Sequence, residues 1–214
     1  MTDVPEDVKR RRPYRSELRR EQAEETRERV LVAAARLFAQ RGFERATIAA
    51  IAAEAGVSPE TVYAGFRNKR TLLGELIRTA VRGGEASPVL EQAGPRAVAA
   101  ATDQREQLSL FAADISRRLE RAAPLVGVVS AASRTEPELA ALLAKLHAER
   151  FENLRLFVQA LAANGPLRLE PEAALETVWA LASPDLHQLL TRTRGWTREH
   201  YRDWLAGSLA RLLL

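Results

Sequence analysis

Glu60 and Thr61 are spaced to face outward from the first turn of a short helix that the sequence predicts after Ser58. Ser58 can cap this helix, and Pro59 stands at its first position, where a missing N–H has no cost. A glutamate carboxylate can accept a hydrogen bond from a cytosine amino group, and a threonine methyl or proline methylene can contact a thymine methyl. With Tyr63 on the same side, these residues fit a helix that reads bases in a DNA major groove. A capping or merely solvated Glu60 is the alternative, since negative charge is favourable in any first helical turn.

An earlier short helix must position this reading helix. Thr47 can cap it, and Gly56 can adopt the positive φ that a sharp corner between two helices needs. Its apolar residues recur at helical spacing: Ile48, Ile51, Ala52 and Ala55. A longer helix is predicted before it, from about Thr26 to Gln40, and another after it, from about Asn68. This order favours a three-helix DNA-binding unit over an ordinary helical hairpin.

The same stretch resembles the tetracycline-repressor (TetR) family of bacterial transcriptional regulators. The resemblance covers residues 26–73 and rests on three spaced groups of residues: Phe38-x-x-x-Gly42-Phe43; Thr47-Ile48-x-x-Ile51-Ala52-x-x-Ala55-Gly56-Val57-Ser58; and Thr61-Val62-Tyr63-x-x-Phe66-x-x-Lys69-x-x-Leu72. It implies phosphate contacts from Thr47, Tyr63 and Lys69, which fix the register on DNA without reading its sequence. Arg45, just before Thr47, stands where a guanidinium can also reach a phosphate.

Composition favours an all-α fold, because the 214-residue chain is rich in Ala, Leu, Arg and Glu and has only six Phe, three Tyr and three Trp. It has no cysteine, which excludes disulfides and thiolate sites and fits a reducing cytoplasm. The net charge of +4 lies entirely in residues 1–70, which hold 15 Lys and Arg against 11 Asp and Glu. This asymmetry is typical of a nucleic-acid-binding module joined to a neutral domain, although a solvated charged surface can give the same small excess.

We therefore expect a helix-turn-helix DNA-binding domain over residues 21–68 and a helical ligand-binding and dimerisation domain over 69–214. Residues 1–20 hold an arginine cluster and almost no apolar side chains, which predicts a disordered basic arm that either contacts DNA or only aids solubility. In the second domain the periodicity predicts these helices: 103–122, a short one from Pro124 to Ser133, 137–163, one over 171–194 kinked by Pro184, and 197–213.

The last two helices, about 171–194 and 197–213, carry apolar residues on more than one face. One face can pack inside the subunit and the other against a second copy, which predicts a homodimer through a four-helix bundle; the resemblance implies the same arrangement. A larger monomer core is the alternative. The resemblance also implies a small effector between the middle helices, and sparse aromatic and cationic content suggests that it is mostly apolar. Its candidate contacts are Phe111, His147, Phe151 and Trp179, for which core packing is the competing interpretation.

No pattern in the sequence indicates an enzyme, a metal site or a cofactor. The three histidines lie outside metal-ligand motifs, and neither a nucleophile elbow nor a phosphate-binding glycine loop occurs. We also expect no signal peptide and no membrane span. The sequence therefore predicts a cytoplasmic, nucleoid-associated repressor that binds double-stranded DNA at a palindromic operator and is released by its effector. An architectural DNA-binding protein without an effector is the alternative, although such proteins usually carry a larger positive charge.

Overall fold

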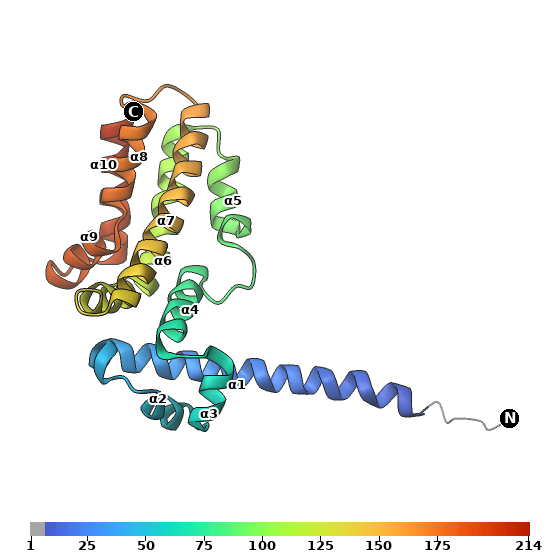
Figure 1. The fold of residues 1–214 in the computed structure, drawn as a ribbon. Helices are drawn as coiled ribbons and strands as arrows, with labels where there is room; N and C mark the ends of the chain where they lie inside the picture. Colours follow the sequence, from blue (N-terminus) through green and yellow to red (C-terminus); the bar gives the residue numbers. More distant parts are fainter. Residues whose placement is uncertain (1–6) are drawn as a thin grey trace. The chain divides into compact units, whose positions relative to one another are not determined.

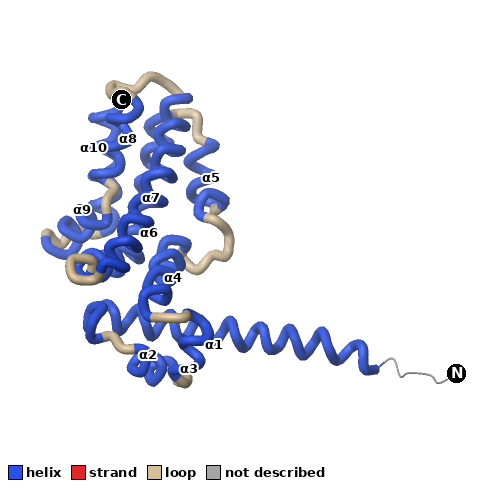
Figure 2. The backbone as a smooth tube through the Cα atoms, viewed as in Figure 1, coloured by secondary structure: helices blue, strands red, loops and turns tan. Residues whose placement is uncertain are grey.

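The computed structural model describes residues 7–214, with side chains from residue 19 onward (Figures 1 and 2). Over this range the chain is helical without strands, so the predicted all-α fold is confirmed. The chain divides into two compact units between Leu72 and Leu73. Each unit buries its own apolar core.

The N-terminal unit contains α1 (Asp7–Arg45), α2 (Ile48–Ala55), α3 (Pro59–Phe66) and the first residues of α4 (Lys69–Arg82). Gly42 interrupts α1 with φ 71 and ψ −178, a conformation that is essentially restricted to glycine. The chain turns there, and the ring of Phe43 stacks with that of Phe38 at 6.0 Å between centroids. The apolar side chains that recur at helical spacing are buried in this unit: Val30, Ala34, Leu37, Phe38, Ile48, Ile51, Ala52, Ala55, Val62 and Phe66.

The basic arm over residues 1–20 differs from the expectation of disorder. From Asp7 onward its backbone is helical and continuous with α1, whereas residues 1–6 lie outside the described part of the chain. Residues 16–28 are rich in Glu and Arg, whose long unbranched side chains lose little freedom in a helix. An ion pair of 3.1 Å between Arg20 and Glu24 adds i, i+4 support.

The C-terminal unit is built around two long antiparallel helices. Its elements after α4 are the 3-10 helix η1 (Val89–Glu91), α5 (Ala93–Ala100), α6 (Gln104–Ala132), α7 (Pro137–Ala163), α8 (Pro171–Leu181), α9 (Pro184–Gln188), the π-helical turn η2 (Leu189–Thr193) and α10 (Arg198–Leu213). Figure 1 shows α6 and α7 in the middle of the unit, with α8 and α10 along one side and α5 along the other. Phe111 of α6 and Phe157 of α7 stack at 3.9 Å between ring centroids, within a core that also includes Leu161, Leu175 and Tyr201.

Pro124 does not begin a new helix, and our prediction of a break there is wrong, because α6 continues through it. A proline removes one helical hydrogen bond and crowds the carbonyl four residues earlier. On both sides of Pro124 the helix is held by buried side chains: Leu119, Ala122 and Ala123 before it, and Leu125, Val126 and Val129 after it. Gln188 of α9 also donates from Nε2 to the carbonyl oxygen of Ala123 at 2.7 Å. Tertiary packing therefore outweighs the local cost of the proline.

The helix predicted over 171–194 is divided by Pro184 rather than kinked. α8 ends at Leu181, and Ser183 caps α9 by accepting a hydrogen bond from the backbone N–H of Leu186 at 3.2 Å. Pro184 then occupies the first helical position, as Pro59 does in α3. A Ser-Pro pair thus starts a new helix at both places.

A membrane-spanning helix is not found among residues 7–214, since none there is both long enough and apolar enough.

Candidate nucleic-acid interface and ligand cavity

The corner between α2 and α3 is fixed by local hydrogen bonds. Thr47 caps α2, its Oγ1 accepting from the backbone N–H of Ala50 at 3.1 Å, and Ser58 caps α3 by accepting from Thr61 N–H at 3.3 Å. Gly56 takes φ 66 and ψ 39, the left-handed conformation that closes a helix, and its N–H bonds the carbonyl of Ala53 at 3.2 Å. These contacts confirm the predicted caps and the predicted glycine corner.

One face of α3 is anchored and the other is exposed. Val62 is 1% exposed and Phe66 is 3% exposed, so both belong to the core of the N-terminal unit. Glu60, Thr61 and Tyr63 are exposed, with Tyr63 at 53%. Ser58 is also exposed and Pro59 is half-buried. The geometry of a reading helix is therefore present, with its polar rim facing outward at its N-terminal end.

Electrostatics at this rim favour an ionised Glu60. Its pKa is lowered because the carboxylate accepts a hydrogen bond from its own backbone N–H and, to a lesser extent, one from the hydroxyl of Ser58. An ionised carboxylate only accepts hydrogen bonds, so it can pair with an amino group on a base edge but repels a phosphate. Ser58 and Thr61 hydroxyls lie 3.2 Å apart and bond each other, which orders both side chains.

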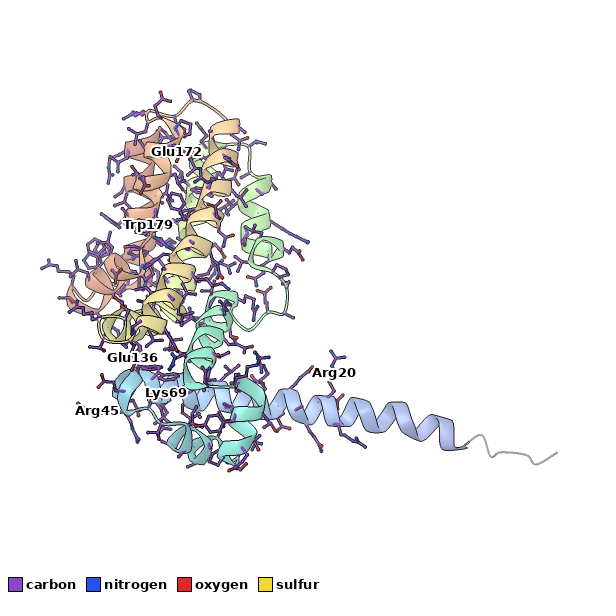
Figure 3. The ribbon with its side chains drawn as sticks, viewed as in Figure 1. Arg20, Arg45, Lys69, Glu136, Glu172 and Trp179 are labelled. Carbon is purple, nitrogen blue, oxygen red and sulfur yellow. The ribbon has the colours of Figure 1, made fainter. Side chains whose placement is uncertain are left out.

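The residues predicted to contact phosphates differ in their solvent exposure and in their contacts within the protein. Arg45 and Thr47 are exposed, and Figure 3 shows Arg45 on the outside of the unit at the end of α1. Lys69 is half-buried, and its Nζ donates to the carbonyl of Phe43 at 2.8 Å while lying 4.1 Å from the centre of the Phe43 ring. Nζ also lies 3.4 Å from the carbonyl oxygen of Glu44. Lys69 therefore joins the start of α4 to the C-terminal end of α1, a structural contribution that the sequence did not predict.

Arg67 is an exposed residue beside α3 that the sequence analysis did not single out. It is the one described non-glycine residue with positive φ, at φ 60 and ψ −53, and the N–H of Asn68 bonds the carbonyl of Phe66 across it at 2.6 Å. This is a γ-turn, a rare and strained conformation for a residue with a Cβ. Backbone strain of this kind is concentrated at functional sites. The sequence gives no sign of the strain at Arg67, because the strain lies in its backbone angles.

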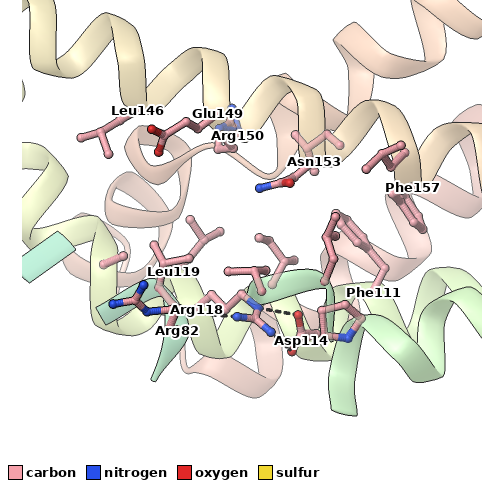
Figure 4. Close-up of a pocket in the computed structure, with 18 of the residues that line it drawn as sticks. Arg82, Phe111, Asp114, Arg118, Leu119, Leu146, Glu149, Arg150, Asn153 and Phe157 are labelled. Atoms are coloured by element: carbon pink, nitrogen blue, oxygen red, sulfur yellow. Dashed lines mark hydrogen bonds and ion pairs between the residues drawn. The ribbon is translucent and has the colours of Figure 1, made fainter. Parts of the chain in front are cut away.

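A second candidate site is a cavity of about 400 Å³ inside the C-terminal unit, in the volume range of small-molecule sites. Its walls come from α4, η1, α5, α6 and α7, with Pro184 from α9. Figure 4 shows Phe111 and Phe157 at one end and Arg82, Leu146 and Glu149 toward the other. Most of the remaining wall is apolar, including Ile77, Val81, Pro88, Val98, Ile115, Leu119, Val126 and Leu154.

Part of the polar lining forms a network around Arg118, which is 6% exposed. Arg118 pairs with Asp114 at 2.6 Å and donates to the carbonyl of Val81 at 2.9 Å and to Oε1 of Gln92 at 2.8 Å. Gln92 in turn donates from Nε2 to the carbonyl of Arg82 at 3.2 Å. The network thus satisfies carbonyls at the C-terminal end of α4 and ties that end to α6.

The four predicted effector contacts do not all reach the cavity. Phe111 and His147 line it, whereas Phe151 and Trp179 do not. Phe151 lies beneath the guanidinium of Arg155 at 5.3 Å, and the ring of Trp179 packs 5.9 Å from that of His147. Burial lowers the pKa of His147, and the nearby charge of Arg150 lowers it further, so His147 is neutral at pH 7.

The polar lining of the cavity was missed, although part of it had a signal in the sequence. Asp114 and Arg118 are four residues apart and share the inward side of the helix with Phe111 and Leu119. Charged residues on an inward side are rarely buried unless they are paired. Arg82, Arg150 and Asn153 carried no such signal.

The last helices leave part of their apolar surface uncovered within one subunit. Leu175, Val178, Leu205 and Leu209 are buried in the core, whereas Leu189 is 53% exposed and Leu212 is 46% exposed. Trp204 and Leu190 are half-buried. This arrangement agrees with the expected two-sided use of these helices, in which one face packs inside the subunit.

Among the described residues, no three His, Cys, Asp or Glu side chains lie close enough together to hold a metal ion. The exposed reading helix and the cavity of about 400 Å³ together define a class of protein, the helix-turn-helix regulator with a ligand-sized cavity.

Comparison with known proteins narrows this class. Residues 30–76 match the sequence profile described as "Bacterial regulatory proteins, tetR family". The N-terminal domain is therefore a TetR-family domain, the chain has the fold of TetR-family transcriptional regulators, and the resemblance seen in the sequence is confirmed. No curated protein sequence matched the chain.

Several solved structures share the fold over most of the chain. A regulator assigned to the TetR family from Rhodococcus sp. has a TM-score of 0.68 at 20% identity, covering 89% of this chain and 100% of its own. NalD from Pseudomonas aeruginosa, the secondary repressor of the MexAB-OprM multidrug efflux pump, has a TM-score of 0.68 at 20% identity over 91% and 98%. A regulator from Saccharomonospora viridis in complex with choline has a TM-score of 0.64 at 24% identity over 89% and 98%.

Proposed function

We propose that this chain is a homodimeric repressor that binds a palindromic operator and leaves it when a small molecule occupies the cavity of the C-terminal unit. The observation that carries the proposal is the capped, outward-facing α3, with Val62 and Phe66 buried and Glu60, Thr61 and Tyr63 exposed. A helix presented in this way can enter a major groove without disturbing the core that supports it.

Each predicted DNA-binding residue of the N-terminal unit has a role in this proposal. Glu60 accepts from a cytosine amino group, and Thr61 or Pro59 contacts a thymine methyl. The groups that hold phosphates and set the register of α3 are those of Arg45, Thr47, Ser58, Tyr63 and Lys69. For Lys69 this contact uses the ammonium group that also bonds the C-terminal end of α1.

Dimerisation supplies the geometry that reads a palindrome. Two recognition helices must lie about 34–36 Å apart, or a multiple of this, to enter successive major grooves on one side of a duplex. The uncovered apolar side chains of the last helices, with Leu189 and Leu212 half exposed, support a second copy packing against the segments 171–194 and 197–213.

The course of α4 supports ligand release. This helix begins at Lys69 in the N-terminal unit, and its later residues Ile77, Val81 and Arg82 line the cavity. A ligand that favours one position of these residues shifts the population of dimers away from the operator-binding spacing. The choline bound by the relative from Saccharomonospora viridis supports the idea that this fold accepts small molecules. In the cell we expect the protein in the cytoplasm, on the nucleoid.

The test is selection of bound duplexes from a random pool by the purified full-length protein. We expect an inverted repeat whose half-site centres lie about 10–10.5 base pairs apart or at a multiple of that distance. Size-exclusion chromatography with light scattering should give a dimer. An asymmetric enriched site or a monomer would overturn the proposal, and binding without any enriched sequence would instead support an architectural role.

A further inference from the structure

The charges that line the cavity are unequal. Four arginines line it, Arg78, Arg82, Arg118 and Arg150, against the two carboxylates of Asp114 and Glu149. Both carboxylates already have an arginine partner. Asp114 pairs with Arg118 at 2.6 Å, and Glu149 lies 3.5 Å from Arg78. Two arginines of the lining therefore remain without a carboxylate partner within the described chain.

The first of these is Arg82, at the C-terminal end of α4. Its Nε is buried and has no hydrogen-bond partner in the described part of the protein. The carbonyl of the same residue is satisfied by Gln92, which fixes the backbone beside the cavity. A buried N–H of a charged group without an acceptor is costly, and such a group is usually satisfied by a ligand or a water molecule.

The second is Arg150 on α7. Its terminal nitrogens donate to the carbonyls of Trp179 at 2.6 Å and Ala182 at 3.4 Å, so its guanidinium is held at the C-terminal end of α8. Its Nε, like that of Arg82, is buried without a partner. Burial lowers the pKa of Arg150 to about 10, so it stays charged at pH 7. A second arginine without a carboxylate in direct contact is therefore held in the cavity wall.

The two arginines lie toward the same end of the cavity, and the opposite end is apolar. Figure 4 shows Arg82 and Arg150 toward one end, Phe111 and Phe157 at the other, and the labelled Asn153 pointing into the space between. We propose that the effector is an amphipathic anion, with a carboxylate-type head at Arg82 and Arg150 and an aliphatic or aromatic body that extends toward Phe111 and Phe157. This inference rests on the proposed function only in taking the cavity as the effector site.

A cationic effector does not fit the same lining. It would need a carboxylate that is free to pair or an aromatic cage around its charge. Asp114 and Glu149 are already engaged by arginines. The rings of Phe111 and Phe157 are stacked on each other with an interplanar angle of 9°, so each covers one face of the other.

The test compares three probes that share one ten-carbon chain and differ in the head group: decanoate, 1-decanol and decylammonium. Binding to the full-length protein is measured by isothermal titration calorimetry. A charge-assisted hydrogen bond to a buried guanidinium should make decanoate bind about 10–100-fold more tightly than decanol. Decylammonium should bind more weakly than either. Equal or tighter binding of decanol or decylammonium, or no binding of any probe, would overturn the proposal.

Variants locate the head group. Arg82→Met removes the charge and the donor while keeping a long apolar side chain, and it should reduce the advantage of decanoate over decanol at least tenfold. Arg96→Met is the matched control, because Arg96 is exposed on α5 and does not line the cavity. Circular dichroism establishes that both variants are folded. An unchanged decanoate advantage in Arg82→Met would overturn the placement of the head group.

The same probes separate this inference from the proposed function. Their effect on an operator duplex bound by the protein is followed by mobility shift. If decanoate bound without releasing the DNA, the inference of an anionic ligand would still hold, but the proposal of ligand release would be overturned. If decanol released the DNA as effectively as decanoate, ligand release would be supported and the anionic head group of the effector would be excluded.

Discussion

Removing the guanidinium of Arg118 should destabilise the C-terminal unit far more than removing a surface charge. Arg118 is 6% exposed, and its partners are Asp114, Gln92 and the carbonyl of Val81. These contacts connect α6 with α4 and with the segment before α5. The substitution Arg118→Met keeps a long apolar side chain, so the measurement isolates the polar network from simple loss of volume.

The expected loss can be worked out from the groups left behind. The carbonyl of Val81 loses the donor at 2.9 Å, and Oε1 of Gln92 loses its donor at 2.8 Å. A buried acceptor left unpaired costs about 1–3 kcal/mol. Asp114, whose side chain is only 14% exposed, retains Arg117 at 3.2 Å. Breaking a buried ion pair by removing one partner typically costs about 3–5 kcal/mol in total, and we expect a loss of unfolding free energy in this range.

The assay is urea denaturation of the full-length protein followed by circular dichroism at 222 nm. Arg117→Met is the matched control, because Arg117 also pairs with Asp114, at 3.2 Å, but its side chain is 49% exposed. A surface pair of this kind contributes about 0–1 kcal/mol. In a double-mutant cycle, Asp114→Asn should cost less in the Arg118→Met background than in the native chain. A loss in Arg118→Met no larger than that in Arg117→Met would refute the reasoning.

Three further predictions concern single side chains. Glu60→Ala should weaken the preference at one base position of the selected operator by about 1–3 kcal/mol, measured with single-position competitor duplexes; equal losses at every position would exclude a reading role. Arg67→Gly should raise the free energy of unfolding by about 1 kcal/mol, because glycine relieves strain at φ 60 and ψ −53 but also loses more freedom on folding; a less stable variant would contradict this. His187 is buried with neither ring nitrogen bonded, and burial lowers its pKa, so the unfolded chain takes up its proton first and stability falls as the pH drops below about 6.5. His187→Phe should reduce this fall between pH 7.5 and 5.5 in denaturation curves, and an identical slope would show that His187 does not contribute.

The helix-turn-helix was predictable from sequence because its determinants are local. Thr47 and Ser58 each cap a helix by accepting from an N–H three residues later, and Gly56 bonds a carbonyl within its own corner. Side-chain periodicity then decides which face is buried, and Val62 and Phe66 follow it. The caps, the glycine corner and the periodicity all depend on residues close together in the sequence, within a window of about twenty residues.

The cavity was not predictable in the same way, because its polar contacts join distant segments. Arg118 reaches Gln92 over 26 residues and Val81 over 37, and Arg150 reaches Trp179 over 29. Phe151 and Trp179 were reasonable candidates by residue type, yet they lie outside the cavity because they pack against Arg155 and His147. A pattern identifies a side chain that can contact a ligand, whereas only the packing of helices decides whether it does.

Pro124 and Gly127 show how a local signal changes meaning in tertiary context. Both are helix breakers by propensity, and Pro124 led us to predict a break in a helix that in fact continues through both residues. A Cβ at Gly127 would lie 2.7 Å from Nε2 of Gln188, the same atom that donates to the carbonyl of Ala123. The glycine therefore leaves room for a side chain from α9 that supplies a donor just before the proline. The two residues are better understood as the place where α9 approaches α6 closely, and this follows only once the partner helix is known.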